Sequence, residues 1–295
     1  MCNAVLLQLL IEIAMNQPLS LSSILKDRAL QKRNKIGIGL TNPTEELISG
    51  LHKAAEFCEP VVYGTDIKGF DSVASEKPEN ALFNDLEAGV IAAAIRGQIS
   101  AEPFRERFIS FYDQHFNPID DMITVIELPK DRPMLISPVS NLTKDTVSER
   151  EKLLDASIRL CQLISLPVKI GLLSRCRFES LIEVAGTPTE QHYIDTEHLV
   201  SKYKDRFDIK NYEVDFEKAY QDGVTILIEP NGTTGNQVIR TLYFLDAIRF
   251  YGAAYMNSSH IVLETFKNGK DYPDVMLLAA ALANYNLTMI KNSTL

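Results

Sequence analysis

Short apolar runs alternate with longer amphipathic segments along most of the chain. The runs end at Gly, Pro or polar residues and are rich in branched or small side chains, as is typical of strands covered on both faces. The segments between them repeat apolar residues at helical spacing. The expected strands are 35–41, 60–63, 89–95, 122–128, 134–139, 168–174 and 224–228. The expected helices are 43–57, 79–87, 101–114, 145–164 and a helix that follows residue 236.

This alternation predicts an α/β protein. Strands separated by helices of this length form βαβ units, in which the strands pair in parallel. The helix expected over 43–57 has a start sequence of its own, Asn42-Pro43-Thr44-Glu45, with an N-cap, a proline at the first helical position and a capping-box glutamate. A strand meets a polar linker at 137–139, which predicts a change of domain there and a return crossing near 257–259.

Two segments are more apolar than the rest. Residues 1–15 carry Gln8 and Glu12 inside the run, lack a preceding basic stretch and are too short to span a bilayer. We expect an amphipathic helix appended to the fold, which either packs on the core or offers a docking face to a partner. Residues 274–289 include asparagines and are also too short for a membrane span, so we expect a buried helix there.

The amino-acid composition indicates a globular protein and argues against nucleic acid as its partner. Of 295 residues, 45% are hydrophobic and 23% charged, which suits a globular protein with a full core. A formal net charge of −9 disfavours sequence-independent binding to the phosphates of nucleic acids. The four cysteines form no Cys-x-x-Cys pair and the five histidines no i, i+4 pair. We therefore expect no metal site, no disulfide framework and a cytoplasmic location.

The sequence from Ile226 to Leu245 contains the clearest candidate for a ligand site. An apolar strand ends at Glu229-Pro230, and a Gly-rich loop then opens an apolar-striped helix. Free N–H groups at a helix start attract phosphate or carboxylate, so the loop is a candidate anion site. Its residues are Asn231, Gly232, Thr233, Thr234, Gly235 and Asn236. The loop matches neither a Walker A sequence nor a dinucleotide fingerprint, and the alternative is a plain βα turn with a capped helix.

Two arginines could add positive charge to such a site. Arg96 follows the strand expected over 89–95, and ligands of parallel sheets bind beyond the carboxyl ends of strands. Its guanidinium could hold a phosphate or carboxylate bidentately, opposite the loop; the alternative is an exposed arginine that caps the strand. Arg240 lies one helical turn after Asn236 and points either toward the loop or, as we favour, into solvent.

No pattern indicates covalent catalysis. The chain lacks a Gly-x-Ser-x-Gly motif and a cysteine in a distinctive setting. The carboxylate pairs Glu183 with Glu190 and Asp195 with Glu197 could act as acid and base, although such carboxylates are far more often part of a solvated surface.

Several segments together resemble the MtxX family, a methanogen-associated, archaeal group that is labelled a methyltransferase subunit and is similar to the phosphate acetyl/butyryl transferases. They are Ala92-Ala-Ala-Ile-Arg-Gly97, Pro138-Val139, the block from Thr234 to Leu245, and Tyr251-Gly-Ala-Ala254. The resemblance runs from about residue 36 to the C-terminus. It implies two doubly wound α/β domains with an interdomain cleft, like those of phosphotransacetylase and isocitrate dehydrogenase.

The resemblance also implies where the domains lie. Residues 1–34 would form an N-terminal helical extension, 35–138 with 257–295 the first α/β domain, and 139–256 the second. Arg96 and the loop from Asn231 to Asn236 would face the cleft, and Lys267 and Arg240 are further possible cleft residues.

One departure from the related transferases bears on chemistry. Phosphotransacetylases carry a Ser-Arg-Gly near the C-terminus that helps to bind acyl phosphate, and Phe266 and Lys267 stand here in place of the serine and arginine. An aromatic ring cannot donate a hydrogen bond to an oxyanion, and lysine lacks the bidentate fork of arginine. Acyl-phosphate chemistry is therefore disfavoured.

The resemblance thus implies a transferase-like methyltransferase subunit that binds an anionic small molecule, phosphorylated or carboxylated, in the cleft. Methyltransferase subunits are the implied partners, with a homodimer as a further possibility, and neither nucleic acid nor a membrane is expected. The sequence contains no glycine fingerprint for S-adenosylmethionine and no corrinoid-ligating histidine motif, so the cofactor is unknown. The alternatives are a phosphate acyltransferase, from acyl phosphate to thiol, and a non-catalytic ligand-sensing subunit, which the N-terminal extension would suit.

Overall fold

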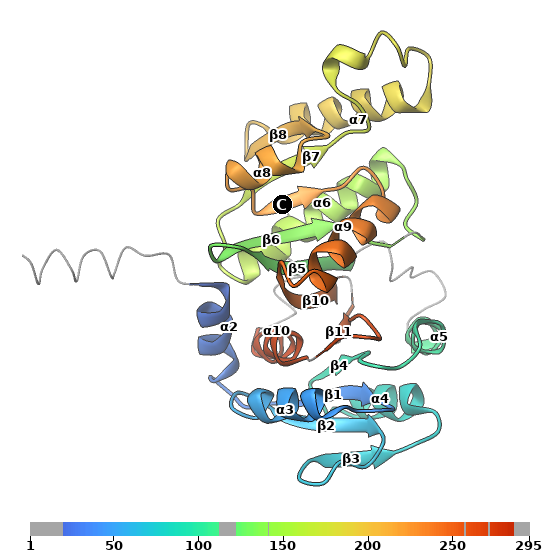
Figure 1. The fold of residues 1–295 in the computed structure, drawn as a ribbon, viewed down its shortest axis with the longest axis vertical. Coiled ribbons are helices and arrows are strands. Elements are labelled where there is room, and N and C mark those ends of the chain that lie inside the picture. Colours follow the sequence, from blue (N-terminus) through green and yellow to red (C-terminus); the bar gives the residue numbers. More distant parts are fainter. Residues whose placement is uncertain (1–19, 112–121, 141, 257, 271, 286–295) are drawn as a thin grey trace, which may run out of the picture.

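The computed structural model describes residues 20–111, 122–140, 142–256, 258–270 and 272–285. Within them, eleven strands form one sheet in the order β3-β2-β1-β4-β11-β10-β5-β6-β9-β7-β8 (Figure 1). The strands are β1 (Lys35–Leu40), β2 (Glu59–Gly64), β3 (Asp71–Ala74), β4 (Ala93–Ile95), β5 (Met122–Leu128), β6 (Arg132–Ser137), β7 (Lys169–Leu173), β8 (Asp208–Glu213), β9 (Ile226–Ile228), β10 (Arg249–Tyr255) and β11 (Ile261–Glu264).

The sheet has two parallel halves that run in opposite directions. Strands β3, β2, β1, β4 and β11 are parallel to one another, and so are β6, β9, β7 and β8. Between the halves, β10 pairs antiparallel with both β11 and β5, and β5 pairs antiparallel with β6. The α/β fold class is confirmed, with antiparallel strands at the centre that join the two halves.

Helices cover both faces of the sheet. One face carries α2 (Leu21–Ala29), α3 (Glu45–Ala54), α6 (Val147–Leu163), α7 (Pro188–Tyr203) and α10 (Pro273–Ala283), whose buried side chains share one continuous core. The other face carries α4 (Pro78–Glu87) and α5 (Ala101–Phe111) over the first half, and α8 (Phe216–Gln221) and α9 (Gly232–Phe244) over the second. Their cores are separate. This second face is therefore divided between α5 and α9.

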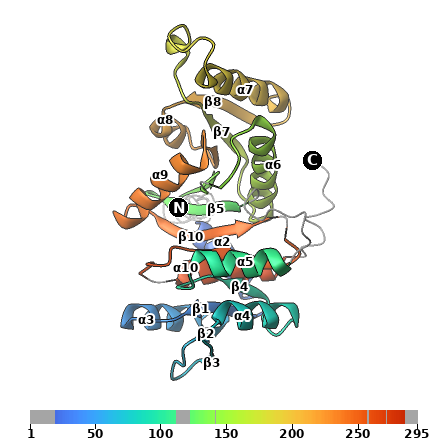
Figure 2. The ribbon, with the colours of Figure 1, turned by 90° about the vertical axis from the view of Figure 1, so that its right-hand side faces the viewer.

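The sheet twists strongly from one end to the other. Figure 2 shows α3 on the left of the lower half and α6, which packs on the same face, on the right of the upper half. A right-handed strand twist that accumulates over many neighbouring strands has this effect. A short 3-10 helix, η2 (Phe178–Ser180), lies in the segment between β7 and α7.

Most expected elements are present, with shifted ends. The strand expected over 89–95 is reduced to β4, because Gly89 has a positive φ of 70° and Val90 is exposed. The helix after residue 42 begins at Glu45, with the Thr44 side chain accepting from the Leu47 amide, so its cap lies two residues later than Asn42. Elements that the sequence analysis did not identify are β3, β8, β10, β11, α7 and α8.

The structure describes most of the apolar segment near the C-terminus and none of the apolar segment over 1–15. Residues 274–283 form most of α10, and its side chains from Val275 to Leu282 are all buried, which confirms the buried helix over this part. The amphipathic helix expected over 1–15 lies outside the described residues, as do 112–114 and 286–289 of two other expected helices. In the described part of the chain, no helix is both long and apolar enough to cross a membrane.

The expected domain boundaries fall at the centre of the sheet. The position 138–139 follows β6 directly, and the return near 257–259 follows β10. Because β5, β6, β10 and β11 are hydrogen-bonded neighbours, the sheet is continuous across both positions. The division into two domains stays a prediction.

Candidate functional site

A cavity of about 240 Å³ lies on the divided face of the sheet, between α5 and α9 and over β10 and β5. It receives side chains from both halves of the sheet. The polar and charged side chains among its lining residues are Arg96, Arg105, Thr124, Ser140, Asn236, Arg240, Tyr255, Glu264 and Thr265. The position is that of a cleft between the two halves, where a ligand would contact both.

Arg96 is a buried residue of this cavity, only 7% exposed. Its Nε pairs with the Glu264 carboxylate, its Nη1 donates to the Ile99 carbonyl oxygen at 2.7 Å, and its Nη2 donates to the Thr265 carbonyl oxygen. The other oxygen of Glu264 accepts from the Tyr255 hydroxyl at 3.1 Å. Arg96 therefore ties the end of β4 to the end of β11, and its charge is balanced within the fold.

Tyr255 completes this polar group from β10. Burial, together with the adjacent Glu264 carboxylate, raises the pKa of Tyr255 well above its ordinary value. The phenol therefore stays protonated and acts as a hydrogen-bond donor to Glu264 at physiological pH.

Two other arginines line the cavity, and no carboxylate among the described residues pairs with either one. Arg105 is half-buried on α5. Arg240 is exposed on α9, and its guanidinium lies 5.3 Å from the ring centroid of Phe244 and 5.5 Å from that of Phe266. The helices on the two sides of the cavity thus each contribute an arginine that forms no ion pair with a described carboxylate.

The rest of the lining is largely apolar. Phe250 and Phe266 have ring centroids 4.8 Å apart, and Tyr243 lies 4.9 Å from Phe266 behind them. Met122 and Ile239 add aliphatic surface. A space lined by one arginine from each flanking helix and by an aromatic wall suits an anion that also carries an apolar group, since low polarity strengthens the attraction between charges.

The residues expected to form a Gly-rich loop lie in the start of α9, which begins at Gly232. Asn231 is the N-cap, and its Oδ1 accepts from the Thr234 amide at 3.0 Å. A Cβ at Gly232 would lie 1.6 Å from the Ser140 carbonyl oxygen, and one at Gly235 2.1 Å from the Pro138 carbonyl oxygen. The two glycines are therefore needed for close packing of α9 on the segment after β6.

The structure brings only part of the expected site together. Arg96, Asn236 and Arg240 line the same cavity, and the Nδ2 of Asn236 donates to the Val139 carbonyl oxygen at 3.0 Å. Lys267 does not line it; its Nζ donates to the Ser100 hydroxyl at 3.0 Å. The remaining expected residues, at the start of α9, do not line the cavity either; they are Asn231, Gly232, Thr233, Thr234 and Gly235.

Sequence reasoning missed several residues of the cavity, among them Arg105, Tyr255 and Glu264. Glu264 ends β11, so the rule that singled out Arg96 would have singled it out as well, had that strand been identified. Arg105 lies within a helix, and only the tertiary packing of α5 brings it beside α9.

The carboxylates considered as acid and base lie elsewhere. Glu190 accepts from the Gly186 amide at 2.6 Å, and Asp195 accepts from Gln191 at 2.9 Å. These two, like Glu183 and Glu197, are absent from the lining of the cavity between α5 and α9.

Among the described residues, neither a metal site nor a reactive cysteine is indicated. No group of three or more His, Cys, Asp or Glu side chains there could hold a metal ion. Cys58, Cys161 and Cys176 are buried free thiols. Burial raises the pKa of Cys58 and of Cys161 to about 12, so neither is a thiolate nucleophile at neutral pH.

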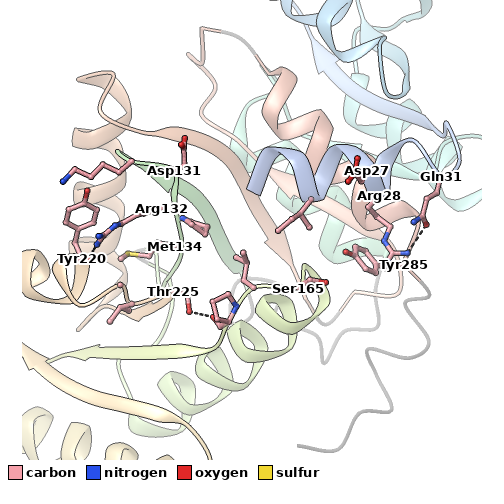
Figure 3. Close-up of a pocket in the computed structure, with 17 residues that line it drawn as sticks. Asp27, Arg28, Gln31, Asp131, Arg132, Met134, Ser165, Tyr220, Thr225 and Tyr285 are labelled. Carbon is pink, nitrogen blue, oxygen red and sulfur yellow. Dashed lines mark hydrogen bonds between the residues drawn. The ribbon is translucent and has the colours of Figure 1, made fainter. Parts of the chain in front are cut away.

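A larger cavity, of about 770 Å³, lies between α2 and the hairpin of β5 and β6 (Figure 3). Its arginines already have hydrogen-bond acceptors: Arg132 donates to the Tyr220 carbonyl oxygen at 2.6 Å, and Arg28 donates to Gln31 Oε1 at 3.0 Å. The cavity is bordered by α2 and Tyr285, beyond which the chain lies outside the described residues. We therefore place the candidate site in the smaller cavity between α5 and α9.

The fold is an α/β fold like that of phosphotransacetylases. A phosphotransacetylase from Streptococcus pyogenes matches with a TM-score of 0.61 at 12% identity, over 90% of this chain and 97% of that one. A branched-chain phosphotransacylase from Enterococcus faecalis matches with a TM-score of 0.59 at 14% identity, over 84% and 99%. At these identities the likeness shows the fold.

Sequence comparison leads to a narrower group. The chain is 21% identical over 270 residues to the "Putative methyltransferase mtx subunit X" of Methanosarcina barkeri, which covers 88% of this chain and 97% of the relative. It is 23% identical over 238 residues to an uncharacterised methyltransferase of Methanocaldococcus jannaschii, over 78% and 90%. No family model matches the chain. The resemblance to the MtxX family is confirmed by these relatives.

Proposed function

We propose that the chain is a transferase-like subunit of the MtxX type, which binds an anionic small molecule in the cavity between α5 and α9. One observation carries this proposal: Arg105 and Arg240 line the cavity without a carboxylate partner among the described residues, whereas Arg96 beside them is paired with Glu264. Unbalanced positive charge beside apolar walls favours an anion. The names of the relatives support methyl transfer and other methyltransferase subunits as partners. The proposed location is the cytoplasm.

The proposal assigns different tasks to the lining residues. Arg105 and Arg240 contact the phosphate or carboxylate, and Phe250 and Phe266 contact the apolar part of the ligand. Arg96 acts as a positioning residue, because its bonds to Glu264 and to two backbone carbonyls hold the strand ends that carry the cavity.

A phosphate acyltransferase is the second candidate, and the phosphotransacylase fold over most of both chains favours it. Phe266 weighs against this candidate, because the cavity wall presents an aromatic ring where the resemblance leads to a serine. Incubation with acetyl phosphate and coenzyme A separates the two, since an acyltransferase forms the thioester. A non-catalytic sensor would bind an anion without turnover of any ligand.

The experiment is a thermal-shift titration with inorganic phosphate, acetyl phosphate and coenzyme A. A ligand at 100 times its dissociation constant adds about 2.7 kcal/mol to the free energy of unfolding. The double variant Arg105→Ala/Arg240→Ala should lose this gain. The control, Lys68→Ala/Lys204→Ala, removes two exposed charges that do not line the cavity and should keep it. Equal gains in the two double variants would refute the proposed site.

A further inference from the structure

A third cavity, of about 520 Å³, lies where α6 and α7 begin, on the face of the sheet opposite α9. No residue lines both this cavity and the one between α5 and α9. Its lining includes Arg150 of α6 and His192 of α7, and its other charged residues are Asp145, Arg175, Glu190 and Asp195. Two of these residues, Arg150 and His192, are buried and incompletely hydrogen-bonded.

Arg150 is a buried cation with neutral partners. It is 2% exposed; its Nη1 donates to the Thr196 hydroxyl at 3.0 Å and its Nη2 to the Leu173 carbonyl oxygen at 3.1 Å. No described carboxylate forms an ion pair with it, and its Nε has no partner among the described residues. Burial lowers its pKa to about 10, with Asp195 acting only as a more distant charge. A buried charge without a counter-ion is costly.

His192 presents an acceptor beside this cation. It is 6% exposed, and its Nε2 lies 3.1 Å from the Pro230 carbonyl oxygen. A carbonyl oxygen can only accept, so Nε2 carries the hydrogen and Nδ1 is left as an acceptor. Nδ1 has no partner among the described residues. Burial and the nearby charges of Arg150 and Arg175 lower the pKa of His192 to about 3, so the ring is neutral at pH 7.

We propose that this cavity binds a small oxyanion that also carries an O–H group. Its charged oxygens accept from Arg150 Nε, and its O–H donates to His192 Nδ1. Dihydrogen phosphate, the monoanion of a phosphate monoester and a hydroxycarboxylate all have this chemistry, whereas sulfate at neutral pH has no proton to donate.

The charges around this cavity are mixed, because the carboxylates Asp145, Glu190 and Asp195 line it as well as the two arginines, and the part of it that attracts an anion is the start of the two helices. Two helices begin at the cavity, with Thr146 and Thr187 as their N-caps, and helix starts attract anions. Arg175 adds a cation at the cavity, although it is paired with Asp145. Both unpartnered atoms are shielded from water. The ligand must therefore displace covering side chains to reach them, and its hydrogen bonds then form out of water, where they are stronger.

Isothermal titration calorimetry at pH 7 tests the proposal with four probes: inorganic phosphate, sulfate, glycolate and acetate. The full chain carries Arg105→Ala/Arg240→Ala, so that binding in the first cavity does not contribute. Phosphate or glycolate should bind, and the matched anion without an O–H group, sulfate or acetate, should bind about tenfold more weakly for one lost hydrogen bond. Preference for phosphate over glycolate would indicate a phosphate source for the ligand, and the reverse a hydroxycarboxylate.

The variant Arg150→Met then removes the buried cation while keeping an apolar side chain of similar length, a change that buried ionic sites often tolerate. It should abolish phosphate binding, and Glu183→Gln, an exposed change outside the cavity, should not. Binding of none of the four probes, equal affinity for sulfate and phosphate, or unchanged binding in Arg150→Met would overturn the proposal.

A second measurement covers the case in which Arg150→Met does not fold. The ¹⁵N resonance of His192 Nδ1 in the otherwise intact chain should move on addition of phosphate, because Nδ1 gains a hydrogen bond, and should stay in place with sulfate. A His192 resonance that ignores phosphate would refute the assignment.

Discussion

Glu229 makes the stability of this protein depend on pH in an unusual direction. It follows β9, is 1% exposed, and its Oε1 has no hydrogen-bond partner among the described residues. Burial raises its pKa from 4.5 to about 7. Between these two values the folded chain holds a proton that the unfolded chain has released, so the free energy of unfolding falls as pH rises.

The variant Glu229→Gln removes this dependence, because glutamine is neutral at every pH. A difference between 4.5 and about 7 amounts to about 3 kcal/mol when it is fully expressed. Most of it develops between pH 5 and pH 8, where the stability of the variant relative to the parent should increase by about 2.5 kcal/mol.

Urea denaturation followed by circular dichroism at pH 5, 6, 7 and 8 measures this difference. The control is Glu183→Gln, an exposed glutamate whose loss should change stability by less than about 0.5 kcal/mol at every pH. A Glu229→Gln variant whose difference from the parent stays constant from pH 5 to pH 8 would show that Glu229 is ionised in the folded protein, and the reasoning would be wrong.

Three further changes test other parts of the structure by thermal or chemical denaturation. Arg96→Ala leaves a buried carboxylate unpaired and should cost about 3 kcal/mol, whereas Lys35→Ala breaks an exposed pair and should cost under about 1 kcal/mol; equal losses would argue against the buried pair. Gly235→Ala places a Cβ 2.1 Å from a carbonyl oxygen and should cost about 2 kcal/mol, with exposed Thr233→Ala nearly neutral as its control; a neutral Gly235→Ala would show that α9 is loosely packed. His192 has its pKa lowered to about 3, so the parent should lose stability as pH falls from 6.5, and His192→Gln should lose less; equal acid sensitivity would contradict a neutral buried ring.

The parts of the fold that the sequence predicts are those with strong apolar patterns. β1 has five consecutive buried residues, and α10 is apolar on every side. Both sequences therefore predict a fully buried element. β8 was missed because it is an edge strand, Asp208-Ile-Lys-Asn-Tyr-Glu213, that buries only Ile209 and Tyr212. The register of β10 shifts at Gly252, which interrupts the alternation of a regular strand.

The candidate site was less predictable, because pairing between distant segments decides it. The rule about strand ends leads to Arg96, and the structure places Arg96 in the cavity. The same rule leads to Glu264 only once β11 is known, and the Glu264 carboxylate reaches Arg96 through the pairing of β4 with β11, which are separated by about half the chain. The Gly-rich segment after β9 indicated a helix start, but the close approach of Pro138 and Ser140 that requires its glycines is a tertiary contact.

The most direct test of the central claim is a crystal structure grown with selenate, whose anomalous scattering locates the anion. Selenate carries no O–H group at neutral pH, so it should avoid the cavity at the starts of α6 and α7. The account predicts an anomalous peak between Arg105 and Arg240. A selenate peak elsewhere, with the cavity between α5 and α9 free of selenate, would contradict the account.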